Sequence, residues 1–216
     1  MKKIVVSGIL AAMLVMVLVG LAMAETAKGK AAPAAATLSA AEFKSNMKRL
    51  WLENVSYSRN FIISSLADLP DLPKLKERLD KNQADIAGEF KTFFGDIVAE
   101  NVAAILKKHS AITEEIIKVV NKGTQEQFLE INAKWEANAE ELAEFLNIKI
   151  PKIAKQTFSN LFYKQLTATS GQIVARVKKD WDSDYAYFDK GLVNIQVVAD
   201  TLADGLVKQF PNKFKK

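Results

Sequence analysis

The sequence predicts an all-α protein: an antiparallel up-down four-helix bundle with additional short helices, preceded by a signal peptide and a disordered linker. Two observations carry this fold class. Apolar residues recur at alternating spacings of three and four along most of the chain, which is the period of one face of an α-helix. The alternation of apolar and polar residues that is typical of β-strands occurs nowhere in the sequence.

The first 24 residues have the composition of a signal peptide. Lys2 and Lys3 precede an apolar run that extends to Leu21, and Ala22-Met23-Ala24 provides the small residues of a cleavage site. The apolar run is also long enough to span a bilayer, so an uncleaved membrane anchor is the alternative. We expect export, with cleavage near Ala24 and a periplasmic or extracellular mature protein.

Residues 25–38 are rich in Ala, Lys and Pro, and we expect a disordered linker because so little apolar surface cannot offset the entropy of ordering. The helical domain then spans residues 39–211, and residues 212–216 form a basic tail. The chain has no cysteine, which excludes disulfides and a lipid-anchored terminus. Its formal charge is +5, with acidic and basic residues mixed along the same segments, unlike the basic stripe of a nucleic-acid-binding protein.

The first half of the domain contains one long helix and two shorter ones. Ser39 and Glu42 have the spacing of a capping box, which predicts a helix over about residues 40–66. The two prolines of Leu69-Pro70-Asp71-Leu72-Pro73 then break the chain. Two shorter helices are expected to lie across one side or end of the bundle, over residues 74–81 and from Asn82, as N-cap, to Gly95.

The second half supplies the remaining helices. The cleanest apolar repeat runs from Asp96 to Val120, Gly123 ends that helix, and Thr124 can cap its successor, so these two helices are expected to form an αα-hairpin. The next helix begins after Pro151 with an interruption around Ser170-Gly171, and the last helix ends at Pro211.

A weak internal repeat connects two of these helices. Five residues between Ala139 and Leu146 match five between Ala199 and Leu206 at an offset of 60. Two hairpins descended from one ancestor would produce this match, and so would the frequent coincidence of small, apolar and acidic residues in helices.

Polar side chains occupy several positions where the helical period predicts apolar ones. Buried polar groups need hydrogen-bond partners, which leaves two interpretations: a hydrogen-bonded layer that fixes helix register, or a small-ligand site in the bundle core. The candidate ligand-binding residues are Asn54, Ser58, His109, Thr113, Asn138, Gln165 and Thr169.

No catalytic or metal-binding motif is complete. With one histidine and no cysteine, His109 lacks the partners of a zinc site, and Leu106 stands where a di-iron Glu-x-x-His pair needs glutamate. Asp180-Trp181-Asp182-Ser183-Asp184 imitates the start of a calcium loop without its glycine and glutamate, so it is interpreted as a solvated acidic turn. We therefore expect a non-enzymatic protein with no cofactor and no bound metal.

A set of motifs is spread over the whole domain: Leu50-Trp51-x-Glu53, Arg59, Leu69-Pro70-Asp71, Arg78-Leu79, Asn82, Asp85-Ile86, Gly95, His109, Trp135, Asn138-Ala139, Ala199-Asp200 and Gln209-Phe210-Pro211. In this pattern the chain resembles a family of uncharacterised bacterial helical-bundle proteins, secreted or soluble and of unknown function. The resemblance implies a helical bundle. It also implies that some relatives bind a metal or cofactor through histidines at the positions of Asn54, Gln165 and Asn194. Amides are poor ligands for transition metals, so this chain would be a degenerate member.

Three functions are compatible with these observations. The first is an exported, non-enzymatic helical bundle that binds a small ligand or a protein partner in the cell envelope. The second is a structural or interaction module of the envelope with no ligand site, and the third is a degenerate member of a histidine-rich metal- or cofactor-binding family. None involves nucleic acid, and contact with a membrane would come through the signal segment if it stays uncleaved.

Overall fold

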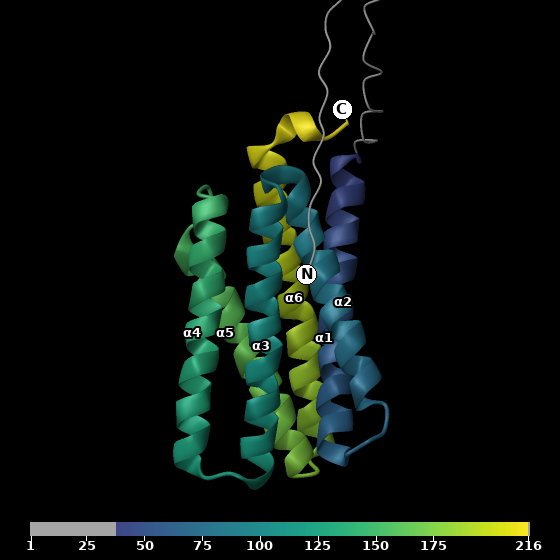
Figure 1. The fold of residues 1–216 in the computed structure, drawn as a ribbon, viewed down its shortest axis with the longest axis vertical. Coiled ribbons are helices and arrows are strands. Elements are labelled where there is room, and N and C mark those ends of the chain that lie inside the picture. Colours follow the sequence, from purple (N-terminus) through teal and green to yellow (C-terminus); the bar gives the residue numbers. More distant parts are fainter. Residues whose placement is uncertain (1–37, 216) are drawn as a thin grey trace, which may run out of the picture. The chain divides into compact units, whose positions relative to one another are not determined.

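In the part of the chain that the structure describes, six α-helices of similar length follow one another with short connections (Figure 1). The computed structural model describes residues 38–215, so the predicted signal peptide and nearly all of the predicted linker lie outside the described residues. The all-α class is confirmed, and the described residues contain no strand. The helices are α1 (Ala40–Ala67), α2 (Leu72–Phe94), α3 (Asp96–Lys122), α4 (Gln125–Lys149), α5 (Lys155–Val177) and α6 (Trp181–Gln209), followed by the 3-10 turn η1 (Pro211–Lys213).

Two of the three predicted N-caps, Ser39 and Thr124, are confirmed. The Glu42 amide donates to Ser39 Oγ over 3.2 Å while the Ser39 amide donates to Glu42 Oε2 over 2.8 Å, which satisfies two amides that lack partners inside α1. Thr124 and Gln127 form the same reciprocal pair at the start of α4. Between α2 and α3 the chain turns at the single residue Gly95, whose φ of 83° is accessible to glycine at little cost.

The helices form two groups in the cross-section of the bundle. The helices α1, α3 and α5 contact one another directly, and each of α2, α4 and α6 packs along two of these inner helices. Because α6 packs against α1 as well as α5, the six helices close into a ring without a connecting loop at that junction. The ion pairs Lys48–Asp200, at 2.9 Å, and Lys44–Asp204 cross the junction.

The C-terminal segment covers one end of the bundle. Within the predicted basic tail of residues 212–216, Phe214 packs on Phe43 and Phe93, with ring centroids 5.3 and 5.8 Å away. The Lys215 amide donates to the Leu38 carbonyl over 3.3 Å, so both ends of the described chain lie side by side. Aromatic burial therefore orders the segment up to Lys215.

The predicted number and length of helices were wrong. Four long helices with two short ones laid across them were expected, whereas α2 is one continuous helix of 23 residues that takes a full place in the ring. Asn82 lies inside α2, because its side chain bonds to α1 and does not cap a helix. The interruption predicted around Ser170-Gly171 is also absent from α5, where the missing side chain of Gly171 makes room for the Tyr187 ring.

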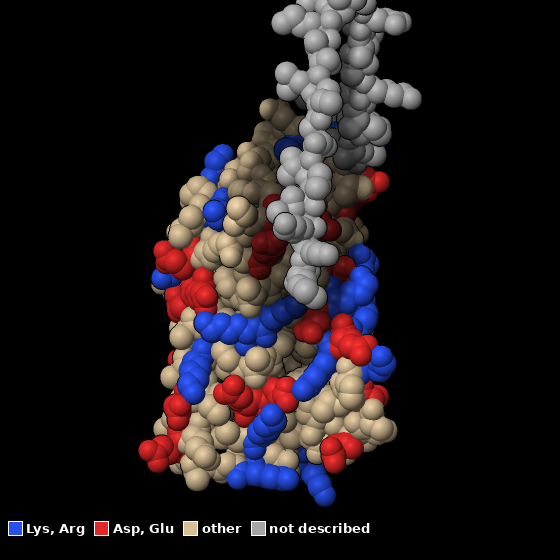
Figure 2. All heavy atoms as spheres, in the orientation of Figure 1, with Lys and Arg blue, Asp and Glu red and all other residues tan. Residues whose placement is uncertain are grey.

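On the uncovered part of the face in view in Figure 2, basic and acidic side chains are interspersed, in agreement with the mixed charge pattern of the sequence. Within residues 38–215, no helix has the length and apolar character needed to cross a bilayer.

Candidate functional site

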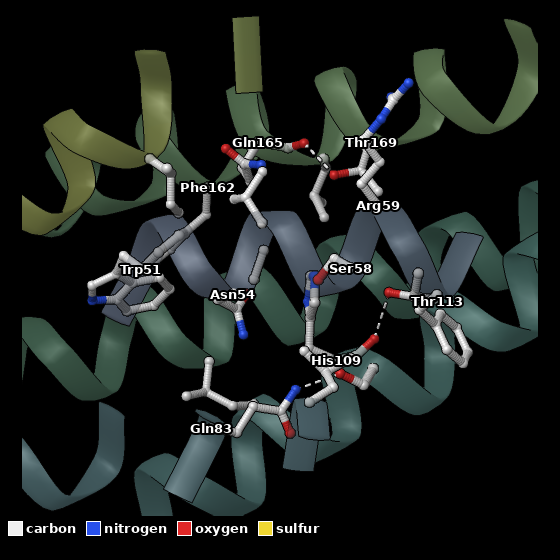
Figure 3. A pocket seen from close by; sticks show the side chains of 18 of the residues that line it. Trp51, Asn54, Ser58, Arg59, Gln83, His109, Thr113, Phe162, Gln165 and Thr169 are labelled. Carbon is white, nitrogen blue, oxygen red and sulfur yellow. Dashed lines mark hydrogen bonds between the residues drawn. The ribbon is translucent and has the colours of Figure 1, made fainter. Parts of the chain in front are cut away.

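The centre of the bundle contains a cavity of about 80 Å³ to which all six helices contribute. The inner helices α1, α3 and α5 supply most of its wall, and Figure 3 shows their side chains meeting around one space. All seven candidate residues from the sequence line this cavity: Asn54, Ser58, His109, Thr113, Asn138, Gln165 and Thr169. The helical period identified these residues on apolar helix faces. Packing of the helices then brings together residues that lie more than a hundred positions apart.

The first candidate residue, Asn54, is held by an asparagine of the neighbouring outer helix. Asn82 of α2 donates from Nδ2 to the Leu50 carbonyl of α1 over 3.0 Å. In turn, Asn54 Nδ2 donates to Asn82 Oδ1 over 2.9 Å. Asn82 is fully buried, so these bonds satisfy an amide that would otherwise be costly in the core.

The same arrangement holds His109. Asn138 of α4 donates from Nδ2 to the Ile105 carbonyl over 3.2 Å, and its Oδ1 lies 3.0 Å from His109 Nδ1. Trp135 Nε1 donates to His109 Nε2 over 3.2 Å, so Nε2 carries the lone pair and Nδ1 the proton in this network. Loss of solvent lowers the pKa of His109 from 6.5 to about 4, and the hydrogen bond to Asn138 offsets a part of that shift. His109 is therefore a neutral imidazole with both nitrogens engaged.

Gln165 is the third residue held in this way. Asn194 of α6 donates from Nδ2 to the Leu161 carbonyl over 3.0 Å and to Gln165 Oε1 over 3.1 Å. We call these three arrangements the asparagine clamps: Asn82 with Leu50 and Asn54, Asn138 with Ile105 and His109, and Asn194 with Leu161 and Gln165.

The hydroxyls of the candidate set are arranged differently. Thr113 donates to the His109 carbonyl over 2.8 Å and Thr169 to the Gln165 carbonyl over 3.0 Å, each within its own helix. Their donors are thus satisfied, while their oxygen lone pairs stay available as acceptors at the cavity wall. Ser58 occupies the corresponding position of α1.

A buried ion cluster beside the cavity was missed from the sequence. Arg59 of α1 donates to both carboxylate oxygens of Asp184 on α6, over 2.8 and 2.9 Å, and to Gln172 Oε1 on α5 over 3.2 Å. Arg176 donates to the same carboxylate over 2.6 Å. The interpretation of 180–184 as a solvated turn is therefore wrong for Asp184, which is 0% exposed because two guanidinium groups neutralise it in the interior.

The candidate set also omitted the clamp asparagines Asn82 and Asn194 on the outer helices. It omitted Gln83 and Ser110 as well, whose side chains hydrogen-bond to each other at the cavity wall. A signal for the asparagines exists in the sequence: asparagine recurs at 82, 138 and 194, with equal spacing. Arg59 and Asp184 had no comparable signal, since the 125 positions between them hide their pairing.

The chemistry of the wall limits what the cavity can hold. Among the described residues, Arg59 is the one charged side chain in the wall, and Figure 3 shows it extending toward α5, where its guanidinium is engaged by Gln172 and Asp184. No carboxylate or lysine lines the space, and the described residues contain no group of three potential metal ligands among His, Cys, Asp and Glu. At about 80 Å³, the cavity suits about two or three waters or an equally small molecule, whereas pockets for larger ligands measure about 300–1,000 Å³.

Not every polar atom of the wall residues is satisfied by the protein. Trp51 Nε1 and Gln83 Oε1 are buried without a hydrogen-bond partner among the described residues. Such atoms cost roughly 1–3 kcal/mol each when they are left unpaired. The hydrogen bonds within the protein therefore leave two polar atoms of the wall residues unpaired, so the polar layer is not a fully paired structural network.

Comparison with known proteins gives no relative for this chain: no family model, no curated protein and no solved structure matches it. Functional inference therefore depends on the site itself.

Proposed function

We propose that this protein is an exported, non-enzymatic helical bundle that binds a small, uncharged polar molecule in its central cavity. The observation that carries the proposal is the composition of the wall: hydroxyl and amide groups from α1, α3 and α5 surround a space in the middle of a core that helical bundles ordinarily fill with apolar side chains. Export rests on the signal-peptide pattern of the first 24 residues.

The charge and size of the cavity define the ligand class. Because the Arg59 guanidinium is already engaged by Asp184 and Gln172 and no other charged side chain of the described residues lines the cavity, a charged ligand would be buried without a counter-ion of its own, which is strongly unfavourable. The volume of about 80 Å³ admits molecules of only a few heavy atoms, such as simple amides and short polyols. Haem, nucleotides and most metabolites are too large.

The test compares the chain from Glu25 onward with two leucine variants on the same helix. Ser58→Leu places a branched side chain in the cavity wall, whereas Ser45→Leu changes an exposed position of α1. Thermal unfolding is measured with acetamide, propionamide, ethylene glycol and glycerol. A bound ligand raises the unfolding temperature of the parent chain and of Ser45→Leu, and the rise is lost in Ser58→Leu. No rise in the parent chain with any of these probes, together with native mass spectrometry that finds no retained small molecule, overturns the proposal.

A structural or interaction module of the envelope is the second candidate, and one surface feature favours it. A groove of about 760 Å³ between α5 and α6 combines apolar and aromatic side chains with a few charged and polar ones, and its Val193 is 65% and its Val197 47% exposed. A groove with exposed apolar side chains suits a protein partner. Under this candidate, Val193→Lys abolishes a cross-link to an envelope protein that Ser45→Leu leaves intact, and a chain that fractionates without any cross-linked neighbour contradicts it.

A further inference from the structure

The three clamp asparagines are separated by 56 residues each, at positions 82, 138 and 194. Each lies on an outer helix, and each donates to a main-chain carbonyl of the preceding inner helix. From this recurrence we infer that the domain consists of three copies of one helical hairpin, α1–α2, α3–α4 and α5–α6, arranged about a pseudo-threefold axis on which the cavity lies.

The outer helices agree in sequence as well as in contacts. Five residues after each clamp asparagine stands an alanine that is at most 3% exposed, and eight residues after it stands a large apolar side chain that is also buried. A small residue at the first position lets the outer helix approach its inner neighbours closely, and the large residue fills the space one turn later. The alanines are Ala87, Ala143 and Ala199, and the large residues are Phe90, Leu146 and Leu202.

The inner helices repeat in the same register. Each clamp holds a polar inner-helix residue, and these three residues are 55 and 56 positions apart along the chain. Four residues after each comes a hydroxyl, and three residues before each comes a large apolar side chain. The polar residues with their hydroxyls are Asn54 with Ser58, His109 with Thr113, and Gln165 with Thr169. The apolar residues are Trp51, Leu106 and Phe162.

The cavity wall follows this repeat closely. All of the polar residues, hydroxyls and apolar residues just named line the cavity, and so do the residues directly after each polar residue and directly after each clamp asparagine. Five equivalent positions from three hairpins thus build most of one wall. A cavity formed by chance between unrelated helices would not draw the same positions from every hairpin.

The internal match noted in the sequence at an offset of 60 has the wrong register. The clamps align Asn138 with Asn194, an offset of 56, which differs from 60 by about one helical turn. A shift of one turn keeps small and apolar residues on the same face, so the match looked plausible at the wrong offset. The offset of 60 also did not reveal the first hairpin, whose clamp asparagine aligns with those of the other two hairpins at an offset of 56.

One difference between the hairpins lies where the ring closes. Arg59 has Glu114 and Ser170 as its counterparts, and its bonds to Gln172 and Asp184 join the first hairpin to the third at the junction that no loop spans. This buried ion cluster joins the two hairpins non-covalently at that junction.

Circular permutation tests the inference, because the two ends of the described chain lie side by side. Lys216 is joined directly to Glu25 in every permutant, and only the new opening differs. Two permutants begin at Asp96 and at Lys155, between hairpins; the control begins at Thr124, inside the second hairpin. We expect the first two to keep the urea midpoint of the parent chain and the control to unfold at lower urea. A control that is as stable as the other two overturns the inference.

The clamps provide a second measurement that does not depend on refolding a permuted chain. Asn82→Ala, Asn138→Ala and Asn194→Ala are compared with Asn101→Ala, which changes an exposed asparagine of α3. Three equivalent clamps predict similar losses in urea midpoint for the first three variants and none for the fourth. A large loss confined to Asn138, the partner of the histidine, would show that the recurrence of asparagine has no common structural role.

Discussion

His109 makes the stability of the protein depend on pH in a direction and by an amount that the structure specifies. Its pKa is about 4 in the folded chain and 6.5 when solvated, so between these values the unfolded state binds more protons than the folded state. The contribution of His109 to stability is therefore complete above pH 6.5 and is lost as the pH falls toward 4. The full difference of about 2.5 pKa units corresponds to about 3 kcal/mol.

The variant for this test is His109→Gln. Glutamine is chosen because the third hairpin has Gln165 at the equivalent position. Urea unfolding of the parent chain and of this variant is followed between pH 7 and pH 5. Carboxylates titrate in both proteins, so the difference between the two slopes isolates the imidazole. For the parent chain, the values for His109 predict an additional loss of about 2 kcal/mol over this range.

The same sequence offers a direct check, because His109 is its one histidine. A proton NMR titration of the folded chain therefore reports a single imidazole without overlap. The expected midpoint is about 4. Above it, the imidazole is expected in the neutral Nδ1-protonated form that the bonds to Asn138 and Trp135 require. A midpoint between 6 and 7, or equal pH slopes for parent and variant, would refute the enclosed and doubly bonded histidine.

Two further predictions concern packing and the ion cluster. Gly171→Ala drives a methyl group into the Tyr187 ring and is expected to destabilise the chain by about 1–3 kcal/mol. Gly88→Ala, which has open space around it, is expected to stabilise the chain by about 0.5–1 kcal/mol. Urea midpoints in the reverse order would contradict the packing between α5 and α6. Arg59→Met removes the bonds of Arg59 to Asp184 and Gln172, while Arg176 still pairs with the buried carboxylate, so we expect a cost of about 1–3 kcal/mol. Adding Asp184→Leu also takes the carboxylate from Arg176, so the double variant is expected to be less stable still in calorimetry, and an Arg59→Met variant as stable as the parent chain contradicts the buried cluster.

The parts of the fold that local chemistry decides were predicted from the sequence. Ser39 with Glu42 and Thr124 with a hydrophobic repeat behind it gave correct helix starts, because capping involves residues only three positions apart. The break between α1 and α2 was found for the same reason, since proline restricts its immediate neighbours. The candidate polar residues were found because a polar side chain on an apolar face contradicts the helical period.

The parts that failed depend on distant partners. Asn82 has the chemistry of a helix cap, and only the Leu50 carbonyl on another helix makes it an interior residue of α2. Gly171 weakens a helix by propensity, yet α5 continues through it because Tyr187 packs there. Asp184 was taken as solvated because acidic residues near a helix start usually are, and its burial follows from Arg59, which is far away in the sequence.

The clamps also explain how a central cavity can persist in a bundle. Apolar helices can slide and rotate to close an empty space, because dispersion contacts have little directional preference. An asparagine that bonds both to a carbonyl and to a side chain of the inner helix fixes the register and rotation of that pair. All three hairpins carry such a clamp where the inner-helix residue it holds lines the cavity, so collapse of the space would break buried hydrogen bonds on every side. The polar layer therefore maintains the space as well as lining it, so the same residues serve both the architecture and the binding site that we propose.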